Sequence, residues 1–202
     1  AQDAVLFSQG NANASIELGT TSDNRLRVKV GENIIVSQNP FDYEQGTWSH
    51  VALVYSNEGK VSAYYNYKQL ISDAIVGEYN GEGNYVFGAS VDGTGHFAGK
   101  MHGARIWDKV LTPARLQTNS LTMLSGAESN LIAYYPMSEA KGSVLTDKAH
   151  GANLEMKGGK WANPEGRSAA FNGKNQYLKL SSGSSCVIDN TMDYTIETWF
   201  KA

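Results

Sequence analysis

Apolar and polar residues alternate with a period of two along much of the chain, and this pattern is typical of half-buried β-strands. In residues 25–30, RLRVKV, the apolar residues Leu26, Val28 and Val30 alternate with basic residues. In residues 48–56, WSHVALVYS, both sets of alternate positions are largely apolar. The first segment is therefore predicted as a strand with one wet face, and the second as a central strand.

Similar strand-like runs follow one another along the whole chain, separated by turns rich in Gly, Asn, Asp or Ser. The one helical signal is LTPARLQTNSLTML, in which Thr112 is the expected N-cap and Pro113 the first helical residue. Many short strands with regular turn signals favour a sandwich. We therefore predict an all-β fold, a two-sheet antiparallel jelly-roll sandwich with one short helix.

Composition excludes several classes of protein. The 202 residues can bury a sizeable core, and the 21 Gly and 11 Tyr favour strands joined by tight turns. A net charge of −3 without any Lys/Arg run argues against binding to nucleic acid or to an anionic membrane surface. The single Cys186 excludes an internal disulfide, and no apolar run is long enough to insert into a membrane.

Several motifs resemble the bacterial laminin-G-like domains of the concanavalin A-like lectin/glucanase superfamily. Residues 46–70, GTWSHVALVYSNEGKVSAYYNYKQL, and residues 97–111, FAGKMHGARIWDKVL, resemble the later motifs of that family. LIAYYPMSE, GRSAAFNGKNQYLKL and DYTIETWF resemble its opening strands. The resemblance covers most of the chain and implies a concanavalin A-like jelly roll.

The order of these motifs is reversed relative to the family, because the opening strands come last. We therefore predict that residues 1–128 are the C-terminal part of one laminin-G-like repeat. Residues 129–202 are then the N-terminal part of the next repeat, and the two parts together supply the sequence of one jelly roll. Either the chain closes on itself as a circular permutation, with residues 193–202 beside residues 1–10, or neighbouring molecules share strands in a head-to-tail fibre. Closure is favoured by the high effective concentration of an intramolecular partner.

The resemblance also implies a function. We expect a non-enzymatic, lectin-like module of a large bacterial surface protein, an adhesin or surface fibre built of tandem repeats. Its partners would be neighbouring repeats and a glycan or a host or cell-surface protein, and its export signal would lie outside this sequence. The alternatives are a self-assembling subunit completed by strand exchange and a glycan-binding module of a carbohydrate-active enzyme.

No catalytic residue is predicted. Hydrolases of the superfamily carry two carboxylates in an E-x-D-x-x-E strand, and no Glu of this chain has an Asp two residues later. Glu17 and Glu197 stand alone on predicted strands and are expected to be surface charges. His50 is expected to be a structural residue at the start of a strand.

The one cofactor considered is calcium, which binds carboxylate, amide and carbonyl oxygens. Many relatives have an Asp-rich loop after the first strand, and in this chain the loop TDKAHGANLEM offers Asp147 and Asn153 as metal ligands. His102 stands where relatives have a second Asp, which weakens the case for calcium.

The candidate ligand-binding residue is Trp161, because sugar binding needs an exposed aromatic side chain beside polar groups. Trp161 lies in a loop rich in Gly, Lys and Asn. The plainer alternative is that it packs against its own loop. The other tryptophans, Trp48, Trp107 and Trp199, lie in strand motifs and are expected in the core.

Overall fold

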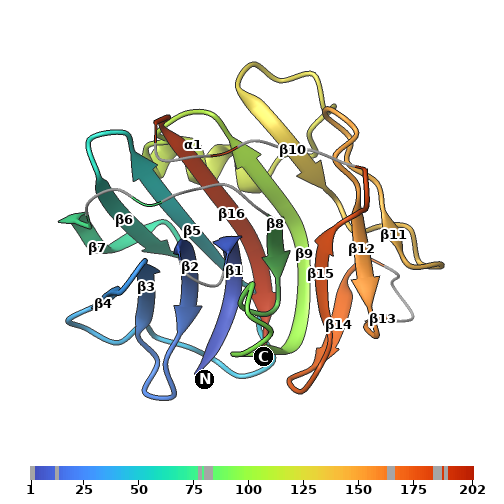
Figure 1. Cartoon of the computed structure of the whole chain (residues 1–202), viewed down its shortest axis with the longest axis horizontal. Helices are drawn as coiled ribbons and strands as arrows, with labels where there is room; N and C mark the ends of the chain where they lie inside the picture. The colour runs from blue at the N-terminus through green and yellow to red at the C-terminus, as the bar shows by residue number, and fades with distance from the viewer. Residues whose placement is uncertain are drawn as a thin grey trace.

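The computed structural model describes residues 3–11, 14–76, 79, 84–162, 167–183, 188 and 191–202. Cys186 lies outside the described residues. The described strands form two antiparallel sheets that enclose one apolar core, with a single short helix on the outside (Figure 1). The predicted all-β jelly-roll sandwich is therefore confirmed.

The first sheet has eight strands in the order β11-β12-β15-β8-β1-β2-β3-β4. Their bounds are β11 (Val144–Leu145), β12 (Leu154–Lys157), β15 (Tyr177–Leu180), β8 (Asn84–Phe87), β1 (Ala4–Asn11), β2 (Ala14–Thr20), β3 (Leu26–Val30) and β4 (Asn33–Val36).

The second sheet has the order β13-β14-β9-β16-β5-β6-β7, and β10 also pairs with β9. Their bounds are β13 (Lys160–Trp161), β14 (Ala169–Asn172), β9 (Ala98–Trp107), β16 (Tyr194–Lys201), β5 (Ser49–Ser56), β6 (Lys60–Tyr65), β7 (Lys68–Ile75) and β10 (Leu131–Tyr135).

Strand β16 lies in the middle of the second sheet, between β5 and β9. Ile196 is aligned with Leu53 of β5 on one side and with Ile106 of β9 on the other. Both sheets therefore contain strands from either side of residue 128, joined within one chain. Strand β1 pairs with β2 and β8 in the first sheet, so the expected pairing of residues 193–202 with residues 1–10 is wrong. The division into parts of two repeats stays a prediction.

Strand β5 is buried on both faces, as its doubly apolar pattern predicts. Val51, Leu53 and Tyr55 point into the core between the sheets. Ala52 and Val54 point to the outer face of the second sheet. There they join a second apolar cluster with residues of β6, β9 and β10 and of helix α1 (Pro113–Ser120).

Helix α1 begins as predicted, with Thr112 as N-cap and Pro113 in its first turn. The Thr112 hydroxyl oxygen accepts a hydrogen bond from the Arg115 backbone N–H at 3.4 Å. Leu116 is the buried anchor of the helix on the outer face of the second sheet. The helix covers only part of this face, and the rest forms the floor of a cleft.

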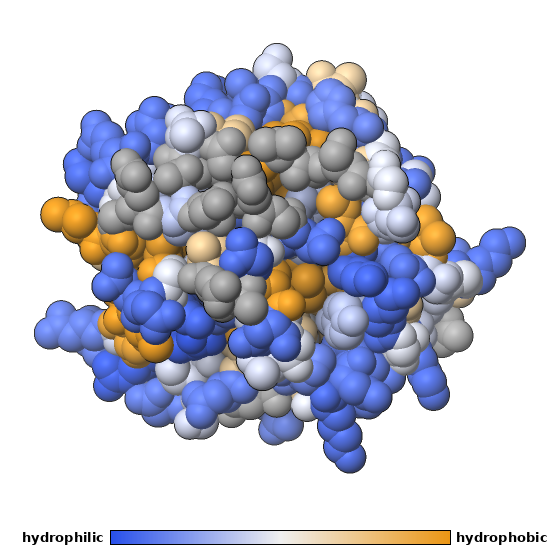
Figure 2. All heavy atoms as spheres, viewed as in Figure 1, coloured by the Kyte–Doolittle hydropathy of each residue, from blue (hydrophilic) through white to orange (hydrophobic). Residues whose placement is uncertain are grey.

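The surface carries a few exposed apolar side chains. Three of them, Ile34, Val36 and Ile75, belong to β4 and β7, the strands at one edge of each sheet. Figure 2 shows hydrophobic residues gathered at this edge, among hydrophilic ones. In the described part of the chain, no helix has the length and apolar character needed to cross a membrane.

Candidate functional site

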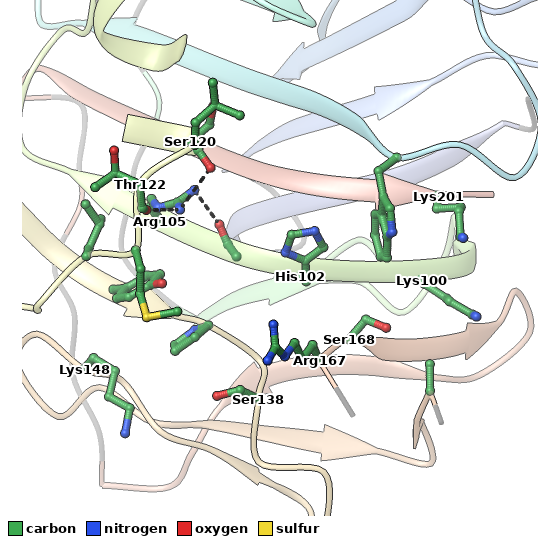
Figure 3. Close-up of a pocket in the computed structure, with 18 of the residues that line it drawn as sticks. Lys100, His102, Arg105, Ser120, Thr122, Ser138, Lys148, Arg167, Ser168 and Lys201 are labelled. Carbon is green, nitrogen blue, oxygen red and sulfur yellow. Dashed lines mark hydrogen bonds between the residues drawn. The ribbon is translucent and has the colours of Figure 1, made fainter. Parts of the chain in front are cut away.

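A cleft of about 870 Å³ lies on the outer face of the second sheet, next to the end of α1 (Figure 3). Lys100, His102 and Arg105 of β9 and Lys201 of β16 contribute to its floor, and Trp48, just before β5, lies beside them. Volumes of this size are common for small-molecule binding sites. The cleft is therefore the main candidate for a ligand site in the described part of the chain.

The walls of the cleft come from three separate segments. Residues 120–125, at the end of α1 and just after it, form one wall. The segment with Pro136 and Ser138 follows β10, and Arg167 and Ser168 come shortly before β14. Figure 3 shows Ser138 and Arg167 on the side of the cleft opposite residue 120. The site is therefore assembled from residues on both sides of residue 128.

A β-bulge at Gly103 places two polar side chains of β9 on the same face. His102 and Arg105 are three residues apart, so in a regular strand they would point to opposite faces. Across the bulge, Trp199 is aligned with His102 and Glu197 with Arg105, so β9 has one residue more than β16. Gly103 has φ of 63°, a conformation that favours glycine. The extra residue thus turns both side chains toward the cleft.

The floor of the cleft contains a row of aromatic side chains. The His102 ring stacks on Trp199, with ring centroids 5.9 Å apart and planes at 3°. Trp48 meets His102 edge to face at 4.4 Å, and the Lys201 ammonium lies 5.4 Å from the Trp48 ring centroid. Trp48 and Trp199 are only partly buried, so the expectation that both lie in the core is wrong. Trp107 is buried on the outer face, under α1.

His102 is neutral at pH 7. Burial, together with the neighbouring Arg105 and His50, lowers the pKa of its imidazole to about 4. The neutral ring can both donate and accept hydrogen bonds. It therefore adds a polar group to an aromatic floor without adding charge.

Arg105 fixes the wall of the cleft to its floor. Its guanidinium donates to the carbonyl of Gly103 at 3.1 Å, of Thr122 at 3.2 Å and of Ser120 at 3.5 Å (Figure 3). It also lies 5.3 Å from the ring centroid of Tyr134, a distance suited to a cation–π contact. These contacts hold the segment after α1 in one position.

Beneath the cleft lies a buried polar network. The His50 Nε2 and Glu197 Oε2 atoms are 2.8 Å apart, and the Trp107 indole N–H donates to Glu197 Oε1 at 3.0 Å. His50 and Glu197 are both fully buried.

Glu17, on β2 of the first sheet, is also buried, and the Ser90 hydroxyl donates to its carboxylate at 2.6 Å. The expectation that Glu17 and Glu197 are surface charges is therefore wrong.

Asp147 stabilises its own loop through backbone hydrogen bonds. Its two carboxylate oxygens accept the N–H groups of Tyr134, Ala149, His150 and Ala152 at 2.8–3.0 Å. The Asn153 side-chain oxygen accepts the Asp147 N–H at 3.0 Å. These donors occupy the oxygens that calcium would need, so the pair does not fit the ion in this arrangement. No group of three His, Cys, Asp or Glu residues suited to a metal occurs among the described residues.

Trp161 does not line the cleft. It lies on β13 at the edge of the second sheet, and its indole N–H donates to the Gly142 carbonyl at 2.8 Å. It also packs against the central core. Its contacts are therefore with the segment around Gly142 and with the core. A role for Trp161 in ligand binding stays a prediction, and the structure brings other residues together instead.

The sequence did not predict that the residues of the cleft meet, although His102 was considered in connection with calcium and Trp48 as a core residue. Lys100, His102 and Arg105 lie close together in KMHGARIW, but their shared face depends on the bulge at Gly103. Arg167 and Lys201 are far from them in sequence. A glycine inside a polar strand segment was the one available signal of a bulge.

The sandwich and its cleft define a concanavalin A-like jelly-roll domain with a candidate binding site on one sheet face. A laminin G family model, described as "Concanavalin A-like lectin/glucanases superfamily", matches residues 1–117. The chain belongs to this superfamily. Searches of curated proteins and of solved structures found no match. The match includes Trp48 and the cleft residues of β9, and it does not include the cleft segments that follow residue 117.

Proposed function

We propose that this domain is a non-enzymatic module that binds an oligosaccharide in the cleft. The observation that carries the proposal is the partly exposed ring of Trp48 beside His102 in a cleft of about 870 Å³. Sugar rings pack their apolar faces on aromatic side chains, while neighbouring polar groups bind the hydroxyls. Ser138 and Ser168 provide hydroxyl groups in the same cleft.

The lining of the cleft supports a binding role rather than hydrolysis. Glycosidases use two carboxyl groups that flank the scissile bond. None of the described residues that line the cleft is Asp or Glu. Glu197, the buried carboxylate beneath the floor, is occupied by His50 and Trp107.

We further propose that the domain is a repeat of an extracellular bacterial surface protein, an adhesin or surface fibre. Membership of the concanavalin A-like superfamily supports an extracellular binding module. The position of β16 between β5 and β9 supports a module that is complete in itself, rather than one that must borrow a strand. Neighbouring repeats would then present many identical clefts along one molecule, which raises avidity.

The experiment is a titration of the purified domain with a panel of oligosaccharides, followed by tryptophan fluorescence and calorimetry. We expect Trp48→Ala to weaken binding about tenfold, because a stacking contact of this kind contributes about 1.4 kcal/mol. Trp161→Ala is the matched control, since Trp161 lies outside the cleft, and it should leave the affinity unchanged. Equal losses in the two variants would contradict the assignment of the cleft.

A further inference from the structure

The cleft concentrates positive charge on a protein whose net charge is −3. Five basic residues line it, and no acidic residue does so among the described lining residues. They are Lys100, Arg105, Lys148, Arg167 and Lys201. Charges of one sign in a concave site reinforce each other's potential. The cleft is therefore electropositive on an otherwise acidic molecule.

These five residues differ from several other basic residues because none of them forms an ion pair with a carboxylate of the described part of the chain. Elsewhere, basic side chains form ion pairs with nearby acids: Arg25–Asp23, Arg27–Glu17, Lys60–Glu58 and Lys157–Glu155. In the described part of the chain, no ion pair includes any of the five cleft residues. No described carboxylate therefore neutralises these charges.

Among the five basic residues, Arg105 is the clearest case of a buried charge that forms no ion pair. It is 4% exposed, and its Nε atom is buried without a hydrogen-bond partner. Glu197 is aligned with it on the neighbouring strand, but the hydrogen bonds of that carboxylate go to His50 and Trp107. A buried charge without a counter-ion is unfavourable. An anion bound in the cleft would offset that cost.

We propose that the ligand of the cleft is an acidic oligosaccharide, a chain of sugar rings bearing carboxylate or sulfate groups. This inference rests on the proposed function, and it adds the chemical class of the sugar. Trp48 offers a ring face, while Lys100 of β9 and Arg167, from the segment before β14, bring positive charge to the same cleft. An acidic sugar satisfies both features at once, through ring stacking and through charge-assisted hydrogen bonds.

An acidic peptide fits the cleft less well. Extended peptides bind chiefly by adding a strand to a free sheet edge. The floor of the cleft is the face of β9 and β16, and both strands are paired on each side within the second sheet. The backbone groups that a peptide strand would use are therefore already occupied.

The test compares the affinity of the whole domain for charged and neutral sugars of equal length by calorimetry. The probes are a short oligogalacturonate, its carboxyl-reduced neutral counterpart, a sulfated dextran oligosaccharide and unsulfated dextran. We expect each acidic sugar that binds to do so at least about tenfold more tightly than its neutral counterpart. Raising NaCl to about 0.5 M should remove most of that difference, because salt screens the charges. The carboxylate and sulfate arms identify the preferred anion.

Two variants locate the effect. Lys100→Gln combined with Arg167→Gln should weaken binding of the acidic sugar about fivefold and leave the neutral sugar unaffected. Lys174→Gln is the control, because Lys174 is an exposed lysine in the β14–β15 turn, outside the cleft. Trp48→Ala should weaken both sugars, which separates ring stacking from charge.

The outcomes separate this inference from the function on which it rests. Equal affinity for charged and neutral sugars would overturn the inference and leave sugar binding intact. The inference would also be overturned if hexaglutamate bound as tightly as oligogalacturonate and Trp48→Ala did not weaken its binding. The cleft would then bind anions without recognising a sugar ring. Absence of binding to every sugar would overturn both proposals.

Discussion

The imidazole of His50 and the carboxylate of Glu197 lie 2.8 Å apart, fully buried beneath the floor of the cleft. They come from β5 and β16, which are 147 residues apart at this point of the sequence. With the indole of Trp107 on β9, the pair ties three neighbouring strands together on the outer face of the second sheet. This network therefore fixes the part of the sheet on which the cleft is built.

The network predicts a large cost for removing the carboxylate. Glu197→Ala leaves the Trp107 N–H and the His50 ring without their shared partner, in a site without access to water. We expect the free energy of unfolding to fall by about 3 kcal/mol. Urea unfolding followed by tryptophan fluorescence measures the change. Glu32→Ala, at an exposed turn position, is the control and should have little effect. Similar losses in both variants would show that the buried network contributes nothing particular.

The depressed pKa of His102 predicts a loss of stability in mild acid. Its pKa is about 4 in the folded protein and about 6.5 in the unfolded chain, so the unfolded chain binds the proton first as the pH falls. The free energy of unfolding should therefore decrease from pH 6.5 to pH 4, by at most about 3 kcal/mol from this residue. His102→Gln, which cannot titrate, should show a shallower decrease. Parallel pH profiles for the two proteins would refute this assignment.

Asp147 should act as a loop stabiliser that does not need calcium. Asp147→Asn replaces one acceptor oxygen by a donor, which then faces two backbone N–H groups. We expect a lower melting temperature, equivalent to about 2 kcal/mol. Millimolar calcium or a chelator should leave the melting temperature of the unmodified protein unchanged. A rise with calcium that disappears in Asp147→Asn would restore the metal site predicted from the sequence.

The central position of β16 predicts a self-contained monomer. Ile196 is 1% exposed, between Leu53 and Ile106, so Ile196→Ala should destabilise the fold by about 3 kcal/mol. Ile75→Ala, at an 81% exposed position, should have almost no effect on stability.

Light scattering over a concentration series should give the mass of one chain at every concentration. A mass that grows with concentration would instead favour strand sharing between molecules.

Local alternation predicted the strands well because it depends on which face of a strand is buried. Val51, Leu53 and Tyr55 point into the core as their spacing indicates. The order of strands within a sheet depends on long-range pairing, which periodicity does not contain. The placement of β16 beside β1 was inferred from the order of motifs in the family, whereas β16 pairs with β5 and β9.

The site was harder to predict, because it depends on what covers the outer face of a sheet. A lone Glu such as Glu197 looks like a surface charge on a strand, but α1 and the residues that flank it cover this part of the sheet. Trp48 was placed in the core because it belongs to a strand motif, although it lies one residue before β5 and reaches the cleft. The single extra residue at Gly103 changes which side chains share a face, and no alternation rule reveals it.

The composite construction of the cleft makes the ligand part of the folding equilibrium. Trp48, Lys100 and His102 precede residue 128, whereas Arg167 and Lys201 follow it, and they meet only when β16 has been inserted into the second sheet. A molecule held by both groups binds the folded chain alone, so at a concentration of about 100 times its dissociation constant it adds about 2.7 kcal/mol to stability. The occupied domain would then resist heat and proteases better than the empty one.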